Sequence, residues 1–153
     1  MIIHRILSIV LILTVQFSFA QTRKPTGPPP ITKEQAAEVK KEAAAMYKDG
    51  RYKDAIAPYT KLVNFDPEDM DFNYKLGMCY VNSNVDKTQA IQYFVKAVDK
   101  KDCPKDAYYY MGKSLLVAGL FDEAIDAFDK YKAVNKGAVN PKFNLDQHME
   151  YCY

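Results

Sequence analysis

The residues that most resemble a chemical motif are Gly112, Lys113 and Ser114, which match the end of the phosphate-binding loop G-x-x-x-x-G-K-S/T. In that loop, backbone N–H groups and the lysine hold phosphate oxygens, and a strand comes before it. Here Ala107 occupies the position of the first required glycine, and the surrounding residues have a helical pattern. We therefore interpret the triplet as helical and predict neither a nucleotide site nor a cofactor.

A second candidate is a metal site built from His148 and Cys152, which are four residues apart and would share one face of a helix. Two ligands on one helix do not complete a metal site, so we favour a packing role and predict no metal. The acidic pair Asp122-Glu123 lies where a helix is expected to begin, which suits the helix dipole. After residue 20 the sequence has one histidine and no Ser-His-Asp arrangement, so we predict a non-catalytic protein.

The first twenty residues have the pattern of a secretory signal peptide. A short basic start, MIIHR, precedes the apolar run ILSIVLILTVQF and the small residues SFA. A membrane anchor would need about 20 apolar residues, whereas this run is shorter and is interrupted by Gln16. We therefore predict cleavage after Ala20 and export to a periplasmic or outer-membrane-associated location.

Residues 21–33 contain four prolines and are predicted to form a flexible Pro-rich linker. Thr32, followed three residues later by Gln35, then predicts a helix that begins near residue 33. The whole chain has 21 Lys plus Arg against 19 Asp plus Glu, with both signs mixed along the sequence. This balance gives no basic stripe of the kind that binds nucleic acid.

The remainder of the chain repeats itself with a period close to 34 residues. Three alanines recur at separations of 35 and 34 residues, and three aromatic residues recur at the same separations: Ala55, Ala90 and Ala124, and Tyr59, Phe94 and Phe128. Each repeat shows the apolar spacing of two amphipathic helices joined by a turn. Such a hairpin cannot bury its apolar face alone, so the repeats must stack.

This pattern resembles the tetratricopeptide repeat, a family of stacked helical hairpins. The resemblance covers three units, at about residues 36–69, 70–104 and 105–139. It implies an all-α, right-handed α-solenoid of three hairpins. Residues 140–153 are expected to add one more helix, with Leu145, Met149 and Cys152 on one stripe that either caps the third unit or continues into a further domain.

In the tetratricopeptide family the first helix of each unit lines a concave face that binds a partner segment. The family's groove positions correspond here to Lys40, Ala44, Tyr47, Tyr74, Met78, Val81, Tyr109, Lys113 and Leu116. One subclass holds a C-terminal carboxylate with Lys and Asn at fixed positions. That clamp is incomplete here, because Ala44 replaces the Asn and Asp106 and Tyr110 replace the third-unit cations.

Two segments, FNYKLGMCYVNSNVDKTQAIQYF and DAYYYMGKSLLVAGLFDEAIDAFDKY, are similar to the N-terminal module of exported bacterial envelope proteins. Members of that group carry a WD40-like propeller and an outer-membrane protein A-type peptidoglycan-binding domain, and some serve secretion or gliding machinery. The resemblance implies a protein-binding adaptor in the cell envelope. The alternative is an N-terminal structural module of a larger peptidoglycan-anchored protein.

The three cysteines, Cys79, Cys103 and Cys152, are an odd number and cannot form a closed disulfide framework. In a stack of hairpins, Cys79 and Cys103 would lie on the order of 10 Å or more apart, and Cys152 belongs to a distant unit. We therefore predict no disulfide within the chain.

Overall fold

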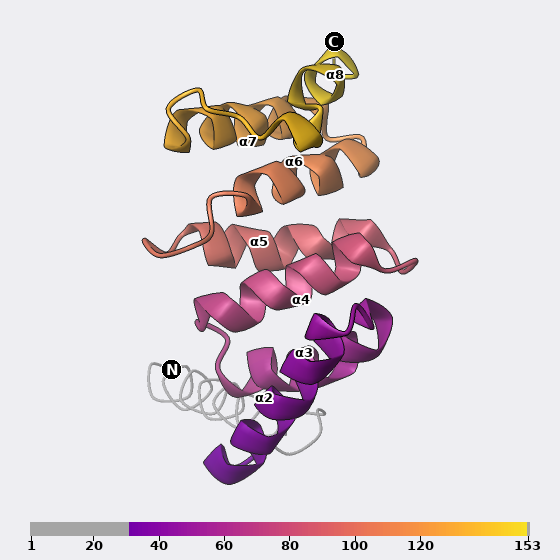
Figure 1. Cartoon of the computed structure of the whole chain (residues 1–153), viewed down its shortest axis with the longest axis vertical. Helices are drawn as coiled ribbons and strands as arrows, with labels where there is room; N and C mark the ends of the chain where they lie inside the picture. The colour runs from indigo at the N-terminus through magenta and orange to yellow at the C-terminus, as the bar shows by residue number, and fades with distance from the viewer. Residues whose placement is uncertain (1–30, 153) are drawn as a thin grey trace, which may run out of the picture.

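Three helical hairpins follow one another along the chain in the computed structural model, which describes residues 31–152. The first hairpin pairs α2 (Lys33–Lys48) with α3 (Tyr52–Phe65), the second α4 (Met70–Asn82) with α5 (Ala90–Val98), and the third α6 (Ala107–Val117) with α7 (Phe121–Val134). Figure 1 shows them as a column of helices from α2 to α8. The predicted signal peptide, and the linker as far as residue 30, lie outside the described residues.

Local sequence signals explain where the helices begin and turn. The Thr32 side chain accepts a hydrogen bond from the Gln35 N–H at 3.3 Å, and the Gln35 side chain accepts one from the Thr32 N–H at 2.8 Å. This capping box confirms the predicted start of α2. Gly50 and Gly119 lie in the turns of the first and third hairpins with φ of 73° and 75°, a left-handed conformation that glycine adopts without strain.

In each hairpin a small residue on the first helix faces an aromatic side chain on the second. A Cβ atom added at Gly77 would lie 2.9 Å from Phe94 Cε1, and one added at Gly112 would lie 2.6 Å from Phe128 Cδ1 and closer still to Cε1. In the first hairpin the corresponding residues, Ala43 and Tyr59, are 0% and 1% exposed. The recurring glycine and aromatic residues thus set how closely the two helices of a hairpin approach.

Two hydrophobic clusters run along the stack and join the hairpins. One is centred on the first hairpin and includes Leu62 and Leu76, and the other joins the second and third hairpins through Phe94 and Phe128. Tyr47 packs against both clusters. The hairpins therefore share their apolar faces, as the repeat pattern predicts.

The C-terminal segment contains the one further helix that was predicted, but this helix is short and does not span residues 140–153. A short 3₁₀ turn, η2 (Pro141–Phe143), is followed by Asn144 with φ of 45°, and only then by α8 (Leu145–Glu150). The Asn140 side chain caps η2 by accepting from the Lys142 N–H at 3.1 Å. Asparagine tolerates the left-handed conformation that breaks the helix here. The apolar stripe faces inward: Leu145 is buried, and Met149 and Cys152 pack against the core.

Substituting alanine for Gly112 is expected to destabilise the protein by about 1–3 kcal/mol, because the new Cβ would displace the Phe128 ring. Ordinarily a Gly to Ala change within a helix stabilises by roughly 0.5–1 kcal/mol, so the sign of the effect is informative. Urea unfolding followed by circular dichroism gives the free energy of unfolding. Gly77→Ala should cost less, because its clash with Phe94 is milder. A stabilised Gly112→Ala protein would contradict the close approach.

Candidate partner-binding surface

Tyrosines from all three hairpins gather around Asp106, the residue before α6. Tyr74 on α4 donates a hydrogen bond from its hydroxyl to Asp106 Oδ1 at 3.0 Å. Burial, together with this carboxylate, raises the pKa of Tyr74 well above its usual value. Tyr47 on α2 has a raised pKa as well, chiefly from burial, with contributions from nearby groups that include Asp106 and Tyr110. The first helices of three successive units thus bring their aromatic side chains into one cluster.

The aromatic rings around Tyr47 hold one another in fixed orientations. Tyr47 makes edge-to-face contacts with Tyr52 at 5.4 Å and with Tyr59 at 6.1 Å between ring centroids. At the other end of the cluster, Tyr110 stacks against Phe94 at 6.5 Å. Such pairs prefer defined geometries, so they hold the aromatic surface in one shape.

The nine predicted groove residues differ widely in exposure. Lys40 and Ala44 are exposed, and four others are half-buried: Tyr47, Tyr74, Lys113 and Leu116. Met78 and Val81 are each 8% exposed and Tyr109 is 3% exposed. These last three residues stabilise the fold and offer little surface. Any partner must therefore contact mainly the remaining six.

Tyr109 is covered by the C-terminal segment. The Phe143 ring stacks on the Tyr109 ring with centroids 4.0 Å apart and planes 5° from parallel. The Tyr109 hydroxyl donates to the Phe143 carbonyl oxygen at 2.6 Å, and His148 Nε2 lies 3.1 Å from the same hydroxyl. Since the single phenolic hydrogen is used on the carbonyl, His148 donates from Nε2.

The position that Tyr109 occupies has the same role in every unit, because Lys40, Tyr74 and Tyr109 each contact the segment that follows. Lys40 Nζ lies 5.1 Å from the centre of the Phe72 ring at the start of the second unit. Tyr74 bonds to Asp106 at the start of the third, and Tyr109 bonds to Phe143 after it. Asp106 and Tyr110, which occupy the third-unit positions of the family's carboxylate clamp, thus contribute to this face, as does Phe143, which the family's groove positions did not include.

The motifs that suggested chemistry have structural roles. Gly112, Lys113 and Ser114 lie inside α6, where the Ser114 hydroxyl donates to the Tyr110 carbonyl oxygen at 3.0 Å. The Cys152 thiol donates to the His148 carbonyl oxygen at 3.4 Å, while the His148 ring contacts Tyr109. Within residues 31–152 no three metal-ligating side chains come together.

All three cysteines are free thiols, and they differ in burial. Cys79 is fully buried, whereas Cys103 and Cys152 are half-buried. Burial raises the pKa of the Cys79 thiol to about 12 and that of Cys103 to about 11. Both thiols are therefore protonated near neutral pH, which makes them weak nucleophiles.

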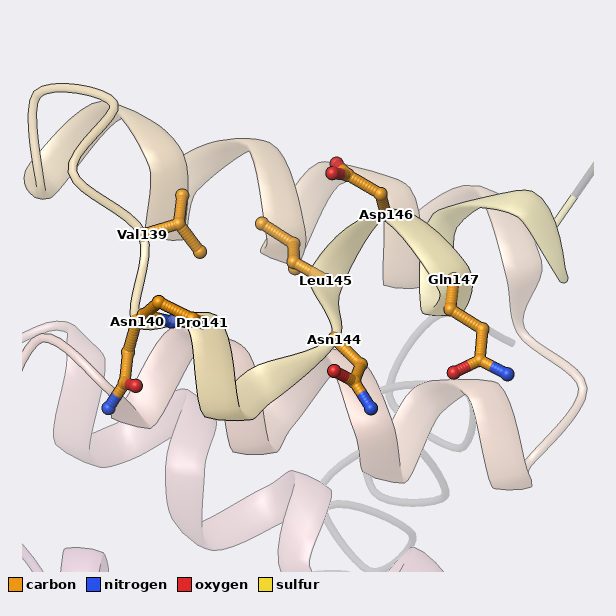
Figure 2. Close-up of a pocket in the computed structure, with 7 residues that line it drawn as sticks. All are labelled: Val139, Asn140, Pro141, Asn144, Leu145, Asp146 and Gln147. Atoms are coloured by element: carbon orange, nitrogen blue, oxygen red, sulfur yellow. The ribbon is translucent and has the colours of Figure 1, made fainter.

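Clefts in the described part of the chain lie beside the C-terminal segment and at the connection between α5 and α6, where Lys100, Cys103 and Tyr108 are among the lining residues. One beside the C-terminal segment, of about 480 Å³, is lined by residues between Val139 and Gln147, and Figure 2 shows the side chains of Asn140, Asn144 and Gln147 pointing downward in the view. Another is lined by Asp106, Tyr131 and Phe143, among others, where the segment meets the third hairpin. Because that cleft adjoins the tyrosine cluster at Asp106, the C-terminal segment forms one border of the candidate surface.

Comparison with protein families gives a direct assignment. A family model for the tetratricopeptide repeat matches residues 40–104 and, in a second match, residues 86–138. Together the matches span residues 40–138, which is more than half of the 153-residue chain. The chain belongs to the tetratricopeptide repeat family. An uncharacterized protein of Methanocaldococcus jannaschii, MJ0572, is 30% identical over 76 residues, which cover 50% of this chain and 87% of that protein.

Solved structures share the fold of this tetratricopeptide repeat protein. The Yersinia enterocolitica type III secretion chaperone SycD, in complex with a peptide of the translocator YopD, is similar with a TM-score of 0.60 and 19% identity, over 81% of this chain and 96% of that one. The second such domain of human RPAP3, in complex with an HSP70 peptide, has a TM-score of 0.62 and 20% identity, over 78% and 95% of the two chains. At these identities the likeness concerns the fold alone.

None of the helices within residues 31–152 combines the length and apolar character that a membrane span requires.

The buried tyrosines predict that the protein loses stability in alkaline solution. Burial raises the pKa of Tyr109 to about 12, and it raises those of Tyr47 and Tyr74 as well. An unfolded tyrosine has a pKa of about 10, so the unfolded state loses protons first as the pH rises. The stabilisation that these tyrosines contribute is complete below about pH 10, and it is lost as the pH approaches their pKa values in the folded state. In parallel titrations of circular dichroism and tyrosinate absorbance, the last part of the tyrosinate absorbance should appear together with the loss of helix above pH 10. Complete tyrosinate formation while the helices remain intact would contradict this account.

Proposed function

We propose that this protein is a non-catalytic protein–protein interaction scaffold that binds a segment of a partner along the first-helix face of its repeats. The observation that carries the proposal is the cluster of Tyr47, Tyr74 and Tyr110 around Asp106, contributed by the first helices of three units. Tyrosine gives a large contact area with one polar atom at low cost in side-chain entropy. A row of such side chains suits an extended protein segment better than a compact small molecule.

The arrangement of charges also supports a protein partner. Lys75 on α4 pairs with Asp71 at 2.9 Å, so these two charges compensate each other, whereas Asp106 keeps its charge and accepts a hydrogen bond from Tyr74. Along the sequence, Lys40 precedes the residues of the aromatic cluster and Lys113 follows them. Lys40 is exposed and Lys113 is half-buried. Solved proteins with this fold include complexes with peptides of YopD and HSP70. Those precedents support a peptide-binding role without identifying the partner of this chain.

We further propose that the partner belongs to the bacterial cell envelope, within a secretion or gliding assembly of the kind that the sequence resemblance implies. The support is the signal-peptide pattern of residues 1–20 and the similarity to exported envelope modules. The alternative is that these repeats form the N-terminal structural module of a larger peptidoglycan-anchored protein, which the same similarity favours.

Site-specific photo-crosslinking tests the proposed binding face. Benzoylphenylalanine placed at Lys40 or Leu116 is expected to crosslink the same partner in envelope extracts, because both positions lie on the predicted face and retain exposed surface. The matched controls are Lys61 on α3 and Lys130 on α7, which are exposed on second helices. Equal crosslinking from the control positions would contradict binding along the first helices.

The mass of the native product tests export and separates the two alternatives. Cleavage after Ala20 predicts a mature chain that starts at Gln21, and an adaptor of this length predicts the mass of residues 21–153. Intact-mass analysis of the protein captured from the envelope fraction measures both. A much larger mass would favour the anchored-protein alternative, and a retained Met1 would contradict the signal peptide.

A further inference from the structure

Lys113, in the third hairpin, is a cation held in a partly dry environment. Its side chain is half-buried, and its Nζ lies 5.7 Å from the centre of the Tyr109 ring. Burial lowers the pKa of Lys113, and the neighbouring cation Lys87 lowers it further. Lys87 lies in η1 (Lys87–Gln89), which contacts α6, so two like charges lie on adjoining elements and repel each other in the absence of an anion.

His148 adds a third basic group to this neighbourhood. Tyr109 joins the two, because its ring faces Lys113 Nζ and its hydroxyl lies 3.1 Å from His148 Nε2. Lys113 is also near enough to lower the pKa of His148, in addition to the effect of burial. The second hairpin, the third hairpin and α8 each contribute one basic side chain.

None of these basic groups has a carboxylate partner within the described part of the chain. The ion pairs found there join Arg51 to Asp54, Lys75 to Asp71, Lys100 to Glu68 and Lys132 to Asp146. The lysines of those pairs lie within 4.0 Å of an acid, whereas Lys87 and Lys113 do not. The cluster therefore has unused capacity to bind an anion.

Exposed apolar side chains follow Lys113 along the chain. Val117, one helical turn beyond Lys113, is 61% exposed. Leu120 and Phe121, where α7 begins, are 42% and 47% exposed. The matching turns of the other two hairpins expose no large apolar side chain, because Tyr52, which corresponds to Phe121, and Val85 in the second turn are both half-buried. Of the three turns, that of the third unit thus has the most exposed apolar side chains.

We propose that Lys87, Lys113, Val117, Leu120 and Phe121, which we name the unit-three edge, bind a partner segment that carries acidic side chains next to aliphatic or aromatic ones. This inference rests on the proposed scaffold function and specifies the chemistry of the partner. Carboxylates would pair with the two lysines, and the apolar side chains would cover Val117 and its neighbours. Free phosphate would satisfy the cations but would leave the apolar residues exposed, so a protein segment fits the whole edge better.

The test measures fluorescence anisotropy of the purified chain with two labelled peptides. One repeats Glu-Leu-Glu-Phe, and the other has Gln in place of each Glu. The acidic peptide is expected to bind about tenfold more tightly at low salt, and added salt should remove most of that difference. Equal affinity for the two peptides would overturn the proposal.

Matched variants assign the effect to the edge. Lys87→Gln and Lys113→Gln should each weaken the acidic peptide by up to about fivefold and leave the Gln peptide unchanged. Val117→Ser should weaken both peptides. Lys61→Gln, an exposed lysine on α3, should change affinity by less than about twofold, in line with an uninvolved surface charge. Lys87 is exposed, so its variant reports on binding even if Lys113→Gln disturbs the packing on Tyr109.

Two outcomes would overturn the proposal in different ways. If Lys61→Gln weakens binding as much as Lys87→Gln, the attraction is nonspecific. If inorganic phosphate displaces the acidic peptide while Val117→Ser has no effect, the edge is a simple anion site. Either result leaves the scaffold function open, because photo-crosslinking from Lys40 tests that function at the other end of the stack.

Discussion

The contact between a small residue on the first helix and an aromatic ring on the second is the constraint on which the rest of the structure depends. Cβ atoms added at Gly77 and Gly112 would lie 2.9 Å or less from the rings of Phe94 and Phe128. In the first hairpin, Ala43 and Tyr59 occupy the corresponding positions and are both buried. Without this close approach the hairpins could not present a continuous apolar face to one another. The stacking of units, and with it the shared face of first helices, follows from that contact.

A second recurring position connects one unit to the next. Lys40, Tyr74 and Tyr109 occupy the same place in the three repeats, and each reaches into the segment that follows. The chemistry of the contact varies between a cation over a ring and a hydroxyl that donates to oxygen, whereas its location stays the same. Alignment with the tetratricopeptide repeat places this position in the groove, and the structure shows that its side chain also contacts the next unit. The two roles compete, because a side chain that holds the next unit has less surface left for a partner.

Periodicity was enough to predict the hairpins, since spacing of apolar residues, glycines and aromatics depends on helix geometry alone. The start of α2 followed from Thr32 and Gln35 for the same reason, because a capping box is a local interaction. The break at Asn144 was not predicted. Leu145, Met149 and Cys152 have helical spacing, and the left-handed Asn144 before them directly follows Phe143, which stacks on Tyr109. That contact joins residues 34 positions apart, so no local pattern contained it.

The C-terminal segment takes the place that the first helix of another unit would occupy. The Tyr74 hydroxyl donates to the Asp106 carboxylate at the start of the third unit, and the Tyr109 hydroxyl donates to the Phe143 carbonyl oxygen, so a contact between units recurs in a segment that is not itself a full repeat. Because η2 and α8 cover Tyr109, the aromatic surface left for a partner is shifted toward the first two units. The third unit then contributes Lys113 and its exposed turn instead of its central tyrosine. A stack of three similar hairpins thereby becomes asymmetric, with an aromatic end and a basic, apolar end, and this asymmetry would fix the direction in which a bound segment lies.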